Sequence, residues 1–443
     1  MRGGGTVAAN RGVSVFWFFY NVLFTIGYVL MLPKFLLRMA RRGGYGRRFG
    51  ERFGRYEPDV LARLQERRRI WVHAVSVGEM YVALRFLRAL REQRPDASFI
   101  LSTVTSTGRA VAERSVDPRD VVVYFPVDFP WAVRRVLRTV QPRAMVFTET
   151  ELWPNMLRLA RDGGVRTAVI NGRLSDRSYR GYRRIRPFFR RAAGCLDLVC
   201  VQSETDRQRF ADLGVLPERI EVLGSAKYDV AEYDPTGEAK AGEVLAAAGM
   251  GRETPILLGG STWPGEEAVL LDVFCRLRAD FPALRLVLVP RHAERAGDVA
   301  AEIARRKLAF VRRKELAAGL PAKPPDVLLV DTTGELKHFY ACATVIFVGK
   351  SLTQHGGQNI IEPALFGKPI ITGPHLENFA DIAADFCAAG ALAQVQDGAE
   401  LEAQVRRLLG DEALRRQQGQ RAAALVQQKK GTIHATAARI DRL

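Results

Sequence analysis

The sequence predicts an α/β protein made of two doubly wound, Rossmann-like domains that follow an N-terminal membrane anchor. Beyond Arg69, short β-branched runs alternate with helix-like stretches, and this alternation is typical of a parallel sheet. The alternation stops near residue 231, in a segment rich in Gly, Ala and charged residues, and then starts again. The length of 443 residues also exceeds one ordinary compact core and indicates two or three domains.

The first element is an apolar segment of 22 residues without a charge between Arg11 and Lys34, and about 20 such residues span a bilayer as a helix. Trp17, Tyr20 and Tyr28 suit the interfaces of a membrane. Basic residues follow directly: Lys34, Arg38, Arg41, Arg42, Arg47 and Arg48. Because positive charge stays on the cytoplasmic side, we expect a single-pass anchor at 1–40 and the rest of the chain in the cytoplasm.

Two alternatives for this segment stay open. A cleaved signal peptide is disfavoured because the apolar stretch is long, ends at Pro33 beside basic residues and lacks a small-residue cleavage site. The other is a helix that lies in the plane of the membrane, since Asn21 and Gly27 interrupt the apolar run. Either geometry of the uncleaved segment attaches the protein to a membrane.

The first domain is placed at 41–230 because its strand-like runs follow one another closely: IWVHAVSV, SFILSTVT, VVVYFPV, RAMVFTET, TAVING, LDLVCVQS and IEVLGSAKYDV. Residues 231–252 are poor in large apolar side chains and are predicted to be an interdomain linker. The second domain, 253–443, repeats the pattern with PILLGGST, LRLVLVPRH, DVLLVDTT, ATVIFVGKS and KPIITGP. Doubly wound sheets bind ligands beyond the carboxyl ends of their strands, so the residues there are the candidates for function.

The formal charge of +18 is concentrated in two stretches. Residues 1–70 hold fourteen Lys or Arg against four acidic residues, and residues 173–191 hold eight Arg against one Asp. Such stretches suit an anionic partner, although the second could simply be a solvated face. A membrane surface or a phosphorylated substrate fits better than nucleic acid, because no nucleic-acid motif, zinc-ligand spacing or aromatic-interleaved basic strand accompanies the charge.

The cysteines indicate a reduced, cytosolic compartment. They are odd in number and show no paired spacing: Cys195, Cys200, Cys275, Cys342 and Cys387. Histidines are scattered and no cluster of His and Cys ligands is visible, so we expect no structural metal.

Glu79 in HAVSVGEM follows the strand that begins at Ile70 and opens the next helix. A carboxylate at that strand end can take a proton from an attacking hydroxyl, which accelerates a reaction roughly 10²- to 10⁴-fold. The alternative is that Glu79 stabilises the N-terminus of its helix, as carboxylates do there. Its position in the sequence leaves both roles open.

Another strand runs into FTETELWPN, where Glu149 and Glu151 alternate on an extended segment. If the strands ending near Glu79 and Glu149 are neighbours, one carboxylate can act as a base while the other orients it or interacts with developing charge. Surface acids that cap the next helix are the alternative. Lys227 in GSAKYD, after a further strand, suits an anionic leaving group or a sugar carboxylate, or is merely solvated.

The second domain carries the residue types of a nucleotide site. Gly356 and Gly357 allow the backbone to approach a phosphate, and a helix opening near Asn359 would direct its N–H groups at it. Arg291 can bind the phosphate through two hydrogen bonds, and Glu362 can accept the hydroxyls of a ribose. The G-x-x-x-x-G-K-[ST] and G-x-G-x-x-G fingerprints are missing, which argues against a P-loop or NAD enzyme.

The order and wording of these motifs closely resemble the bacterial 3-deoxy-D-manno-octulosonic acid (Kdo) transferases of lipopolysaccharide synthesis. The resemblance covers nearly the whole chain and rests on HAVSVGE, TETELWPN, NGRLSDRS, GSAKYD, STWPGEE, LVPRHAER, DTTGEL, GGQNIIEP and GPHLENF. It implies a GT-B fold with two Rossmann-like domains facing a central cleft. It also implies CMP-Kdo as donor substrate, a lipid A precursor (lipid IVA) as acceptor, and inversion at the anomeric carbon without a metal or another cofactor.

The same resemblance implies roles for residues of this sequence. Glu79 would be the general base that activates the acceptor hydroxyl, while Glu149 and Lys227 would stabilise the transition state. Contacts to CMP would come from residues in the motifs LVPRHAER, DTTGEL and GGQNIIEP. These residues are Pro290, Arg291, Thr333, Gly334, Glu335, Asn359, Ile360, Ile361 and Glu362. His355 stands where some relatives carry Arg, so no phosphate contact is assigned to it. The implied location is the cytoplasmic face of the inner membrane.

Two rival functions stay open at this point. One is another membrane-associated GT-B glycosyltransferase that uses a UDP-sugar, which its nucleotide preference would reveal. The other is a non-catalytic, membrane-tethered basic scaffold that binds anionic lipid or nucleic acid. The function of such a scaffold would survive replacement of Glu79 by Gln.

Overall fold

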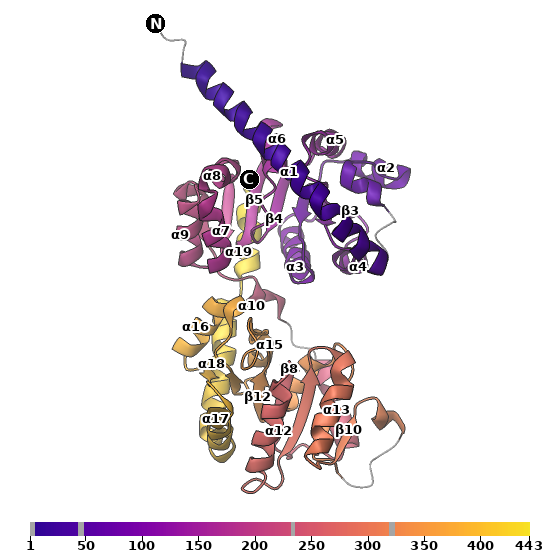
Figure 1. Cartoon of the computed structure of the whole chain (residues 1–443), viewed down its shortest axis with the longest axis vertical. Helices are drawn as coiled ribbons and strands as arrows, with labels where there is room; N and C mark the ends of the chain where they lie inside the picture. The colour runs from indigo at the N-terminus through magenta and orange to yellow at the C-terminus, as the bar shows by residue number, and fades with distance from the viewer. Residues whose placement is uncertain (1–4, 43–47, 232–234, 319–323) are drawn as a thin grey trace. The chain divides into compact units, whose positions relative to one another are not determined.

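The computed structural model describes residues 5–42, 48–231, 235–318 and 324–443. They form two compact units, of which the first contains residues 1–226 together with 431–443 and the second contains residues 227–430. Each unit is built on a parallel sheet of seven strands with helices packed against it (Figure 1).

The first sheet has the strand order β3-β2-β1-β4-β5-β6-β7. Its strands are β1 (Ile70–His73), β2 (Phe99–Thr103), β3 (Val121–Tyr124), β4 (Ala144–Thr148), β5 (Arg166–Gly172), β6 (Leu198–Val201) and β7 (Ile220–Val222). From β1 the chain moves outward to β3 and then returns to place β4 on the other side of β1. In doubly wound sheets, ligands bind where the strand order reverses in this way, which here is the point between β1 and β4.

Helices of the first unit connect these strands and cover the sheet. They are α1 (Gly5–Arg42), α2 (Pro58–Glu66), α3 (Val77–Gln93), α4 (Ser106–Ser115), α5 (Pro130–Val140), α6 (Pro154–Asp162), α7 (Asp176–Arg184), α8 (Arg186–Ala193), α9 (Glu204–Asp212) and α19 (Thr432–Asp441), with 3-10 turns at Phe49–Phe53 and Pro217–Arg219. The core between them contains the fully buried rings of Trp71, Phe125, Phe147 and Phe210.

The second sheet has the order β10-β11-β9-β8-β12-β13-β14. Its strands are β8 (Ile256–Thr262), β9 (Arg285–Pro290), β10 (Phe310–Arg312), β11 (Val327–Leu329), β12 (Val345–Val348), β13 (Ile370–Thr372) and β14 (Leu392–Gln394). Here the order reverses between β8 and β12. The helices are α10 (Lys227–Val230), α11 (Pro235–Ala247), α12 (Glu266–Leu277), α13 (Ala296–Arg305), α14 (Leu336–Cys342), α15 (Ile361–Ala364), α16 (Ala380–Ala388), α17 (Gly398–Gly410) and α18 (Glu412–Lys429), with 3-10 turns at Ala293–Arg295, Glu315–Ala318 and Glu377–Phe379.

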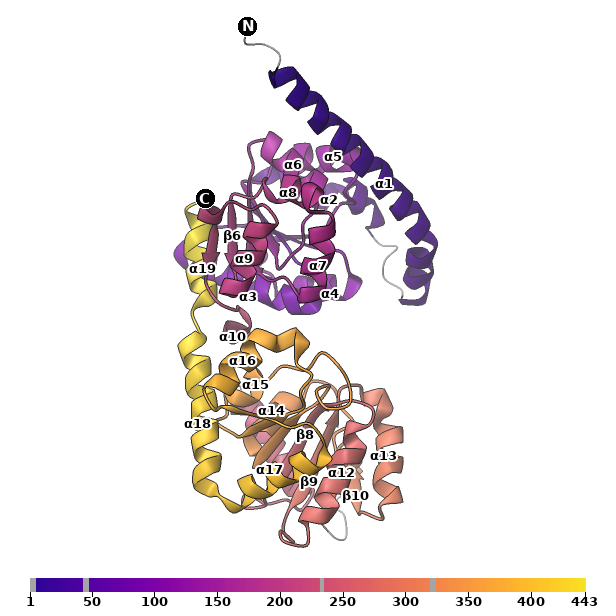
Figure 2. The same ribbon diagram turned by 60° about the vertical axis from the view of Figure 1, so that its left-hand side comes forward.

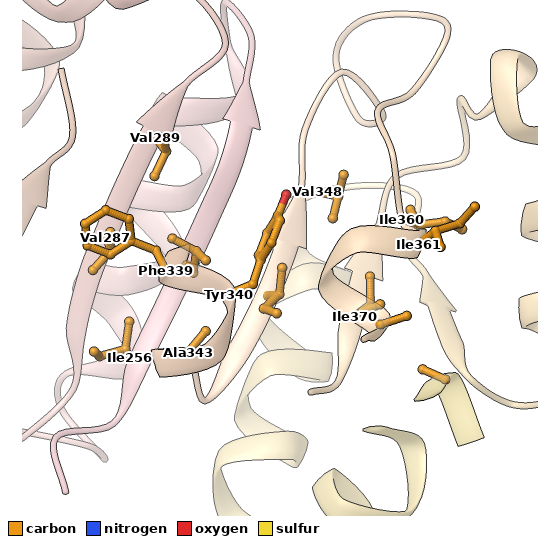
Figure 3. Close-up of a cluster of buried hydrophobic side chains, with 14 of the residues drawn as sticks. Ile256, Val287, Val289, Phe339, Tyr340, Ala343, Val348, Ile360, Ile361 and Ile370 are labelled. Atoms are coloured by element: carbon orange, nitrogen blue, oxygen red, sulfur yellow. The ribbon is translucent and has the colours of Figure 1, made fainter. Parts of the chain in front are cut away.

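Both faces of the second sheet are buried. Leu258 and Val287 belong to the cluster on one face, while their strand neighbours Leu257 and Leu286 belong to the cluster on the other. Successive side chains of a strand point to opposite faces, so continuous apolar runs such as LVLV in β9 are what a doubly covered parallel sheet requires. Figure 3 shows the first cluster, with Tyr340 of α14 between β9 and the segment at Ile360.

The predicted apolar segment forms the helix α1, which lies beside the rest of the first unit (Figures 1 and 2). Within it, residues Val15–Pro33 have a mean hydropathy of 1.9 and are long and apolar enough to cross a membrane. The predicted orientation depends on basic residues that lie outside the described side chains, namely Lys34, Arg38, Arg41, Arg42 and Arg47. Arg48 is described and faces Glu57 at 3.4 Å.

The segment expected to be a linker, 231–252, instead contains α11, whose residues Ala241, Val244 and Leu245 are buried in the core of the second unit. The Gly and Ala content that indicated a linker permits close packing between helices. A Cβ atom added to Gly237 would lie within 1.9 Å of the His338 ring in α14. Small residues therefore mark a helix contact here, not a flexible connection.

The C-terminal end also differs from the expected division, in which residues 253–443 formed one domain. Helix α19 belongs to the first unit and packs on α3. Arg94 and Asp441 form an ion pair of 2.6 Å, and the Thr432 hydroxyl donates to the carbonyl of Leu223 at 3.0 Å. The last residues of the chain thus complete the unit that its first half builds.

Candidate functional site

The site of the first unit lies at the reversal of strand order. Strands β1 and β4 pair in parallel, with Ile70 opposite Ala144 and His73 opposite Phe147. Because parallel strands end at the same edge of a sheet, the residues that follow β1 and β4 lie beside each other. The first loop leads to Glu79, and the second begins at Glu149.

Glu79 is held in a capping box at the start of α3. Its backbone N–H donates to the Ser76 hydroxyl at 3.2 Å, and its carboxylate accepts hydrogen bonds from the N–H groups of Val75 at 3.0 Å and Ser76 at 3.2 Å. The Thr148 hydroxyl, from β4, adds a bond of 2.9 Å. A carboxylate has about four acceptor positions, and these contacts use three of them. The helix-capping role is realised, and it does not remove Glu79 from the site.

Glu149 follows β4 in a left-handed backbone conformation, with φ at 55°. This conformation is uncommon for residues other than glycine and is concentrated at functional sites. A hydrogen bond of 2.9 Å from its N–H to the carbonyl of Ile170 in β5 fixes the turn. The turn redirects the chain at the strand end and presents Glu149 and Glu151 beside Glu79.

Glu151 is the residue of this site to which the sequence assigned no role. Burial raises the pKa of its carboxyl to about 7, with additional contributions from the negative charges of Glu79 and Glu149. A carboxyl with a pKa near neutrality next to two other acids is a common feature of sites that transfer protons. In the sequence, the alternating acids of TETEL were the signal that could have indicated a role for Glu151. Only the structure shows that the charges of Glu79 and Glu149 act on its carboxyl.

His73, at the end of β1, has a structural environment. It is fully buried, its ring stacks on Phe125 with centroids 3.8 Å apart, and its Nδ1 lies 3.0 Å from the Ser102 hydroxyl. Burial lowers its pKa to about 3, so the ring is neutral at physiological pH.

The second unit has an equivalent point between β8 and β12, and Glu266 holds it together. This fully buried carboxylate accepts four backbone N–H bonds of 2.8 to 3.0 Å, from Trp263, Lys350, Ser351 and Leu352. Ser261 and Lys350, on the two strand ends, both have left-handed backbone conformations, with φ of 51° and 56°. The STWPGEE motif therefore clamps the two loops to each other.

Arg291 and Glu362, the predicted phosphate and ribose ligands, lie in one electrostatic environment. Burial raises the pKa of Glu362. A hydrogen bond from Asn359 and the positive charges of Lys337 and Arg291 act in the opposite direction and lower this pKa. The Asn359 amide donates to Glu362 at 3.1 Å. Arg291 is exposed and its N–H donates to the carbonyl of Thr262 at 3.0 Å, just after Pro290 ends β9.

Ile360 and Ile361 are fully buried in the hydrophobic core (Figure 3). Their side chains are therefore turned away from any ligand, and only their backbone groups can face one. The helix expected to open near Asn359 is a single turn, Ile361–Ala364, whose first N–H already donates to the Asn359 side chain at 3.0 Å. The left-handed Gly367 follows this turn, so the segment is not the start of an extended helix.

The Gly356–Gly357 loop is also occupied by contacts within the protein. The N–H of Gly356 donates to the Glu377 carboxylate at 2.6 Å, and that of Gly357 donates to the carbonyl of Lys350 at 2.8 Å. Both glycines have positive φ, at 115° and 71°, as expected of a tight loop. In this conformation the two N–H groups do not face a phosphate.

The remaining predicted residues lie at two other loops of the second unit. Thr333 and Gly334 are exposed in the turn between β11 and α14, and Glu335 beside them pairs with Arg313 at 3.3 Å. Lys227 begins α10, where its ammonium donates to the carbonyl of Asn378 at 3.4 Å and lies 4.4 Å from the centre of the Phe379 ring.

Among the described residues, His355, His375 and Glu377 are grouped closely enough to hold a metal ion, with ligand atoms within 4.8 Å of one another. The His355 ring pairs with Glu377 at 2.9 Å, and this hydrogen bond is the main reason that the pKa of Glu377 is lowered. The three side chains are exposed or half-buried, and the hydrogen bond between His355 and Glu377 links two of them.

Comparison with known proteins places these observations in a family. Residues 47–230 match the family described as 3-deoxy-D-manno-octulosonic-acid transferase (kdotransferase). The 3-deoxy-D-manno-octulosonic acid transferase of Haemophilus influenzae is 32% identical over 94% of this chain and 96% of its own length. The transferase of the same name from Bordetella pertussis is 36% identical over 93% of this chain and 95% of its own length.

The fold is shared with a solved glycosyltransferase from Rickettsia africae, with a TM-score of 0.58 and 12% identity over 84% of this chain and 97% of the other. At this level of identity the likeness concerns the fold alone. Together with the two parallel seven-stranded sheets, it confirms the expected GT-B class and the expectation of two Rossmann-like halves.

Proposed function

Because the chain belongs to the family of Kdo transferases, we propose that it transfers Kdo from CMP-Kdo to the lipid A precursor lipid IVA. It is a glycosyltransferase of lipopolysaccharide biosynthesis. The proposal concerns the acceptor, the stereochemistry and the residues that act. The observation that carries it is the convergence of Glu79, Glu149 and Glu151 at the strand reversal of the first unit.

The proposed reaction is a single displacement with Glu79 as general base. An acceptor hydroxyl oxygen forms a bond to the anomeric carbon of Kdo while the bond from that carbon to the CMP phosphate breaks. The electron pair leaves with CMP, and the hydroxyl proton passes to Glu79. Attack opposite the leaving group inverts the anomeric centre. The hydrogen bonds from Val75, Ser76 and Thr148 fix the orientation of the carboxylate that receives the proton.

Glu149 and Lys227 are proposed to stabilise the transition state. Positive charge develops at the anomeric carbon as the bond to CMP breaks, and a fixed carboxylate such as Glu149 favours that charge. The ammonium of Lys227 suits the opposite charge, which builds up on the departing phosphate or is carried by the Kdo carboxylate. Neither role requires a metal ion, and we propose that the reaction proceeds without one.

The second unit is proposed to bind CMP. Arg291 provides an exposed guanidinium for the phosphate, and Glu362, oriented by Asn359, provides an acceptor for the ribose hydroxyls. The Thr333–Glu335 turn and the backbone at Ile360 and Ile361 would complete the site. Because the N–H groups of Gly356 and Gly357 are already bonded, phosphate binding by that loop would require it to rearrange.

The enzyme is proposed to act at the cytoplasmic face of the inner membrane, attached through α1. The exposed face of this helix is apolar, with Phe18, Leu23 and Leu30 between 65% and 74% exposed. Its other face contacts the rest of the first unit, where the Tyr20 hydroxyl donates to Asp128 at 2.7 Å. A helix docked along one side favours the in-plane geometry over a free membrane span.

The decisive experiment measures CMP release from CMP-Kdo, generated in situ, with tetraacylated lipid A precursor as acceptor. Wild type is compared with Glu79→Gln and with Glu218→Gln, an exposed carboxylate of the same unit, at equal amounts of folded protein. We expect acceptor-dependent release by the wild type and by Glu218→Gln, unchanged by EDTA, and a loss of at least about 10²-fold in Glu79→Gln.

Each other outcome changes the proposal in a defined way. Equal release by wild type and Glu79→Gln would keep the transferase and remove the general base. Release that depends on a divalent cation would overturn the metal-free mechanism. Release without acceptor, or no release with this donor, would overturn the proposed reaction itself.

A further inference from the structure

An open pocket of about 410 Å³ lies between α1 and the rest of the first unit. Such a volume is in the range of small-molecule sites. Helix α1 contributes Phe24, Gly27, Tyr28, Met31 and Leu32, and the facing wall contains Phe125, Pro126, Val127, Trp153 and Arg52. Nearly all of these side chains are apolar. Polar headgroups or sugars would find few hydrogen-bond partners there, whereas hydrocarbon would lose its contact with water.

One wall of the pocket exists only because α1 is docked. Phe24 and Tyr28 pack against Phe129, with ring centroids 5.4 and 5.2 Å apart. One turn earlier, the amide of Asn155 donates to the Asn21 side chain at 2.7 Å. The two residues that interrupt the apolar run of α1 thus lie on the face that contacts the rest of the unit. Asn21 accepts this hydrogen bond, and Gly27, which has no side chain, lines the pocket.

The pocket is continuous with the apolar outer face of α1. Met31 lines the pocket and is nevertheless 67% exposed, and its neighbour Leu30 is 74% exposed. Met31 therefore connects the pocket to this apolar outer face, along which a hydrocarbon chain would reach it.

Two residues of the pocket wall are neighbours of residues at the carboxylate site. Trp153 lines the pocket and lies two residues after Glu151, and Phe125 lines it while stacking on His73 at the end of β1. A molecule with its apolar chain in this pocket would therefore have its polar part near Glu79 and Glu149.

We propose that this pocket binds one fatty acyl chain of the lipid acceptor, and that α1 is thereby a wall of the acceptor site as well as a membrane attachment. The inference rests on the proposed lipid acceptor. It extends that proposal in two ways. It assigns an apolar subsite to the acceptor, and it gives a substrate-binding role to a helix whose hydropathy indicates only an anchor.

Gly27 offers a direct test because an added Cβ atom would meet nothing within 4 Å. Gly27→Phe fills the pocket from a helical position that tolerates a side chain, and Gly27→Ala fills it slightly. Ile26→Phe is the matched control, since Ile26 is 52% exposed and does not line the pocket. Kdo transfer by the full-length protein is measured in mixed micelles with tetraacylated lipid A precursor and with the same disaccharide bisphosphate after complete deacylation.

Gly27→Phe should raise KM for the tetraacylated acceptor about tenfold, with kcat nearly unchanged. The wild type should bind the deacylated acceptor more weakly than the tetraacylated one. Gly27→Phe should leave the KM for the deacylated acceptor unaltered. Gly27→Ala should show a smaller effect of the same kind, and Ile26→Phe none. Equal KM values for Gly27→Phe and wild type, or an equal rise for both acceptors, would overturn the inference while the transferase stands. Failure of the wild type to transfer Kdo to either acceptor would overturn the proposed function and this inference with it.

Discussion

The hydroxyl of Thr148, the last residue of β4, lies 2.9 Å from the Glu79 carboxylate and 3.0 Å from the carbonyl of His73. It joins the end of β4 to the end of β1 and to the first turn of α3. The proposed base is therefore positioned by a neighbouring strand that is far away in the sequence. This contact is buried, and a hydrogen bond to a charged group in such a place contributes roughly 1.5–3 kcal/mol.

Thr148→Val should lower kcat for Kdo transfer about tenfold and leave KM for CMP-Kdo unchanged, because the base loses its orientation while the donor unit is untouched. Thr148→Ser retains the hydroxyl and should restore most of the activity. Steady-state kinetics of the three proteins test this. A rise in KM without a loss of kcat, or a serine variant as impaired as the valine variant, would exclude the positioning role.

Glu151 should make the stability of the protein depend on pH between about 4.5 and 7. Its pKa is raised from 4.5 to about 7 in the folded protein, so the folded state binds more protons than the unfolded state in this range. The free energy of unfolding therefore falls as pH rises, by at most about 3 kcal/mol from this group.

Glu151→Gln removes that dependence, so the variant should gain stability relative to the wild type between pH 5 and pH 8. Denaturant unfolding at both pH values measures the difference. If the difference between the two proteins is the same at pH 5 and pH 8, the pKa of Glu151 is not raised.

Glu266→Gln should destabilise the second unit by about 3 kcal/mol. The glutamine amide group would face two of the four N–H donors that now bond to the carboxylate, and donors cannot bond to each other. We also expect CMP binding to weaken about tenfold or more, because the loops after β8 and β12 lose their clamp.

Thermal unfolding and calorimetric titration with CMP check this, and Glu253→Gln, at an exposed position of the same unit, is the control. A stable Glu266→Gln protein with unaltered CMP affinity would show that the clamp is dispensable.

Tyr20→Phe should loosen α1 from the rest of the first unit. The Tyr20 hydroxyl donates to Asp128 at 2.7 Å, and the fully buried Asp128 carboxylate also accepts the N–H groups of Asn155 and Met156, each at 2.9 Å. Burial raises the pKa of Asp128 to about 6, and hydrogen bonds to an ionised acceptor are the stronger ones. The loss should therefore be larger at pH 8 than at pH 5.

Hydrogen exchange of the amides in residues 15–33, in detergent micelles, measures the docking of α1. We expect exchange at pH 8 to be about tenfold faster in Tyr20→Phe once intrinsic rates are corrected, a change of about 1.4 kcal/mol. Tyr81→Phe, at a residue that is 48% exposed, should behave as the wild type. Unchanged protection of α1 in Tyr20→Phe would mean that the aromatic contacts alone hold the helix.

Local patterns of residues determined much of this protein in advance. Alternating β-branched runs and helical stretches depend on neighbours in the sequence, so they predicted two parallel α/β halves and the apolar helix α1. The same holds for the placement of Glu79 and Glu149 after strands, because the pattern marks where each strand ends. The family was indicated by the residues of the motifs and their order along the chain, because composition and periodicity do not identify a family.

The tertiary structure decided which of these elements meet. Only the pairing of β4 with β1 brings Glu149 and Glu151 to Glu79 and raises the pKa of Glu151. The assignment of α19 to the first unit, the packing of the Ala- and Gly-rich α11 in a core, and the pocket under α1 likewise depend on contacts between distant residues. Such contacts follow from complementary surfaces and burial over the whole unit, which the period of a single segment does not encode.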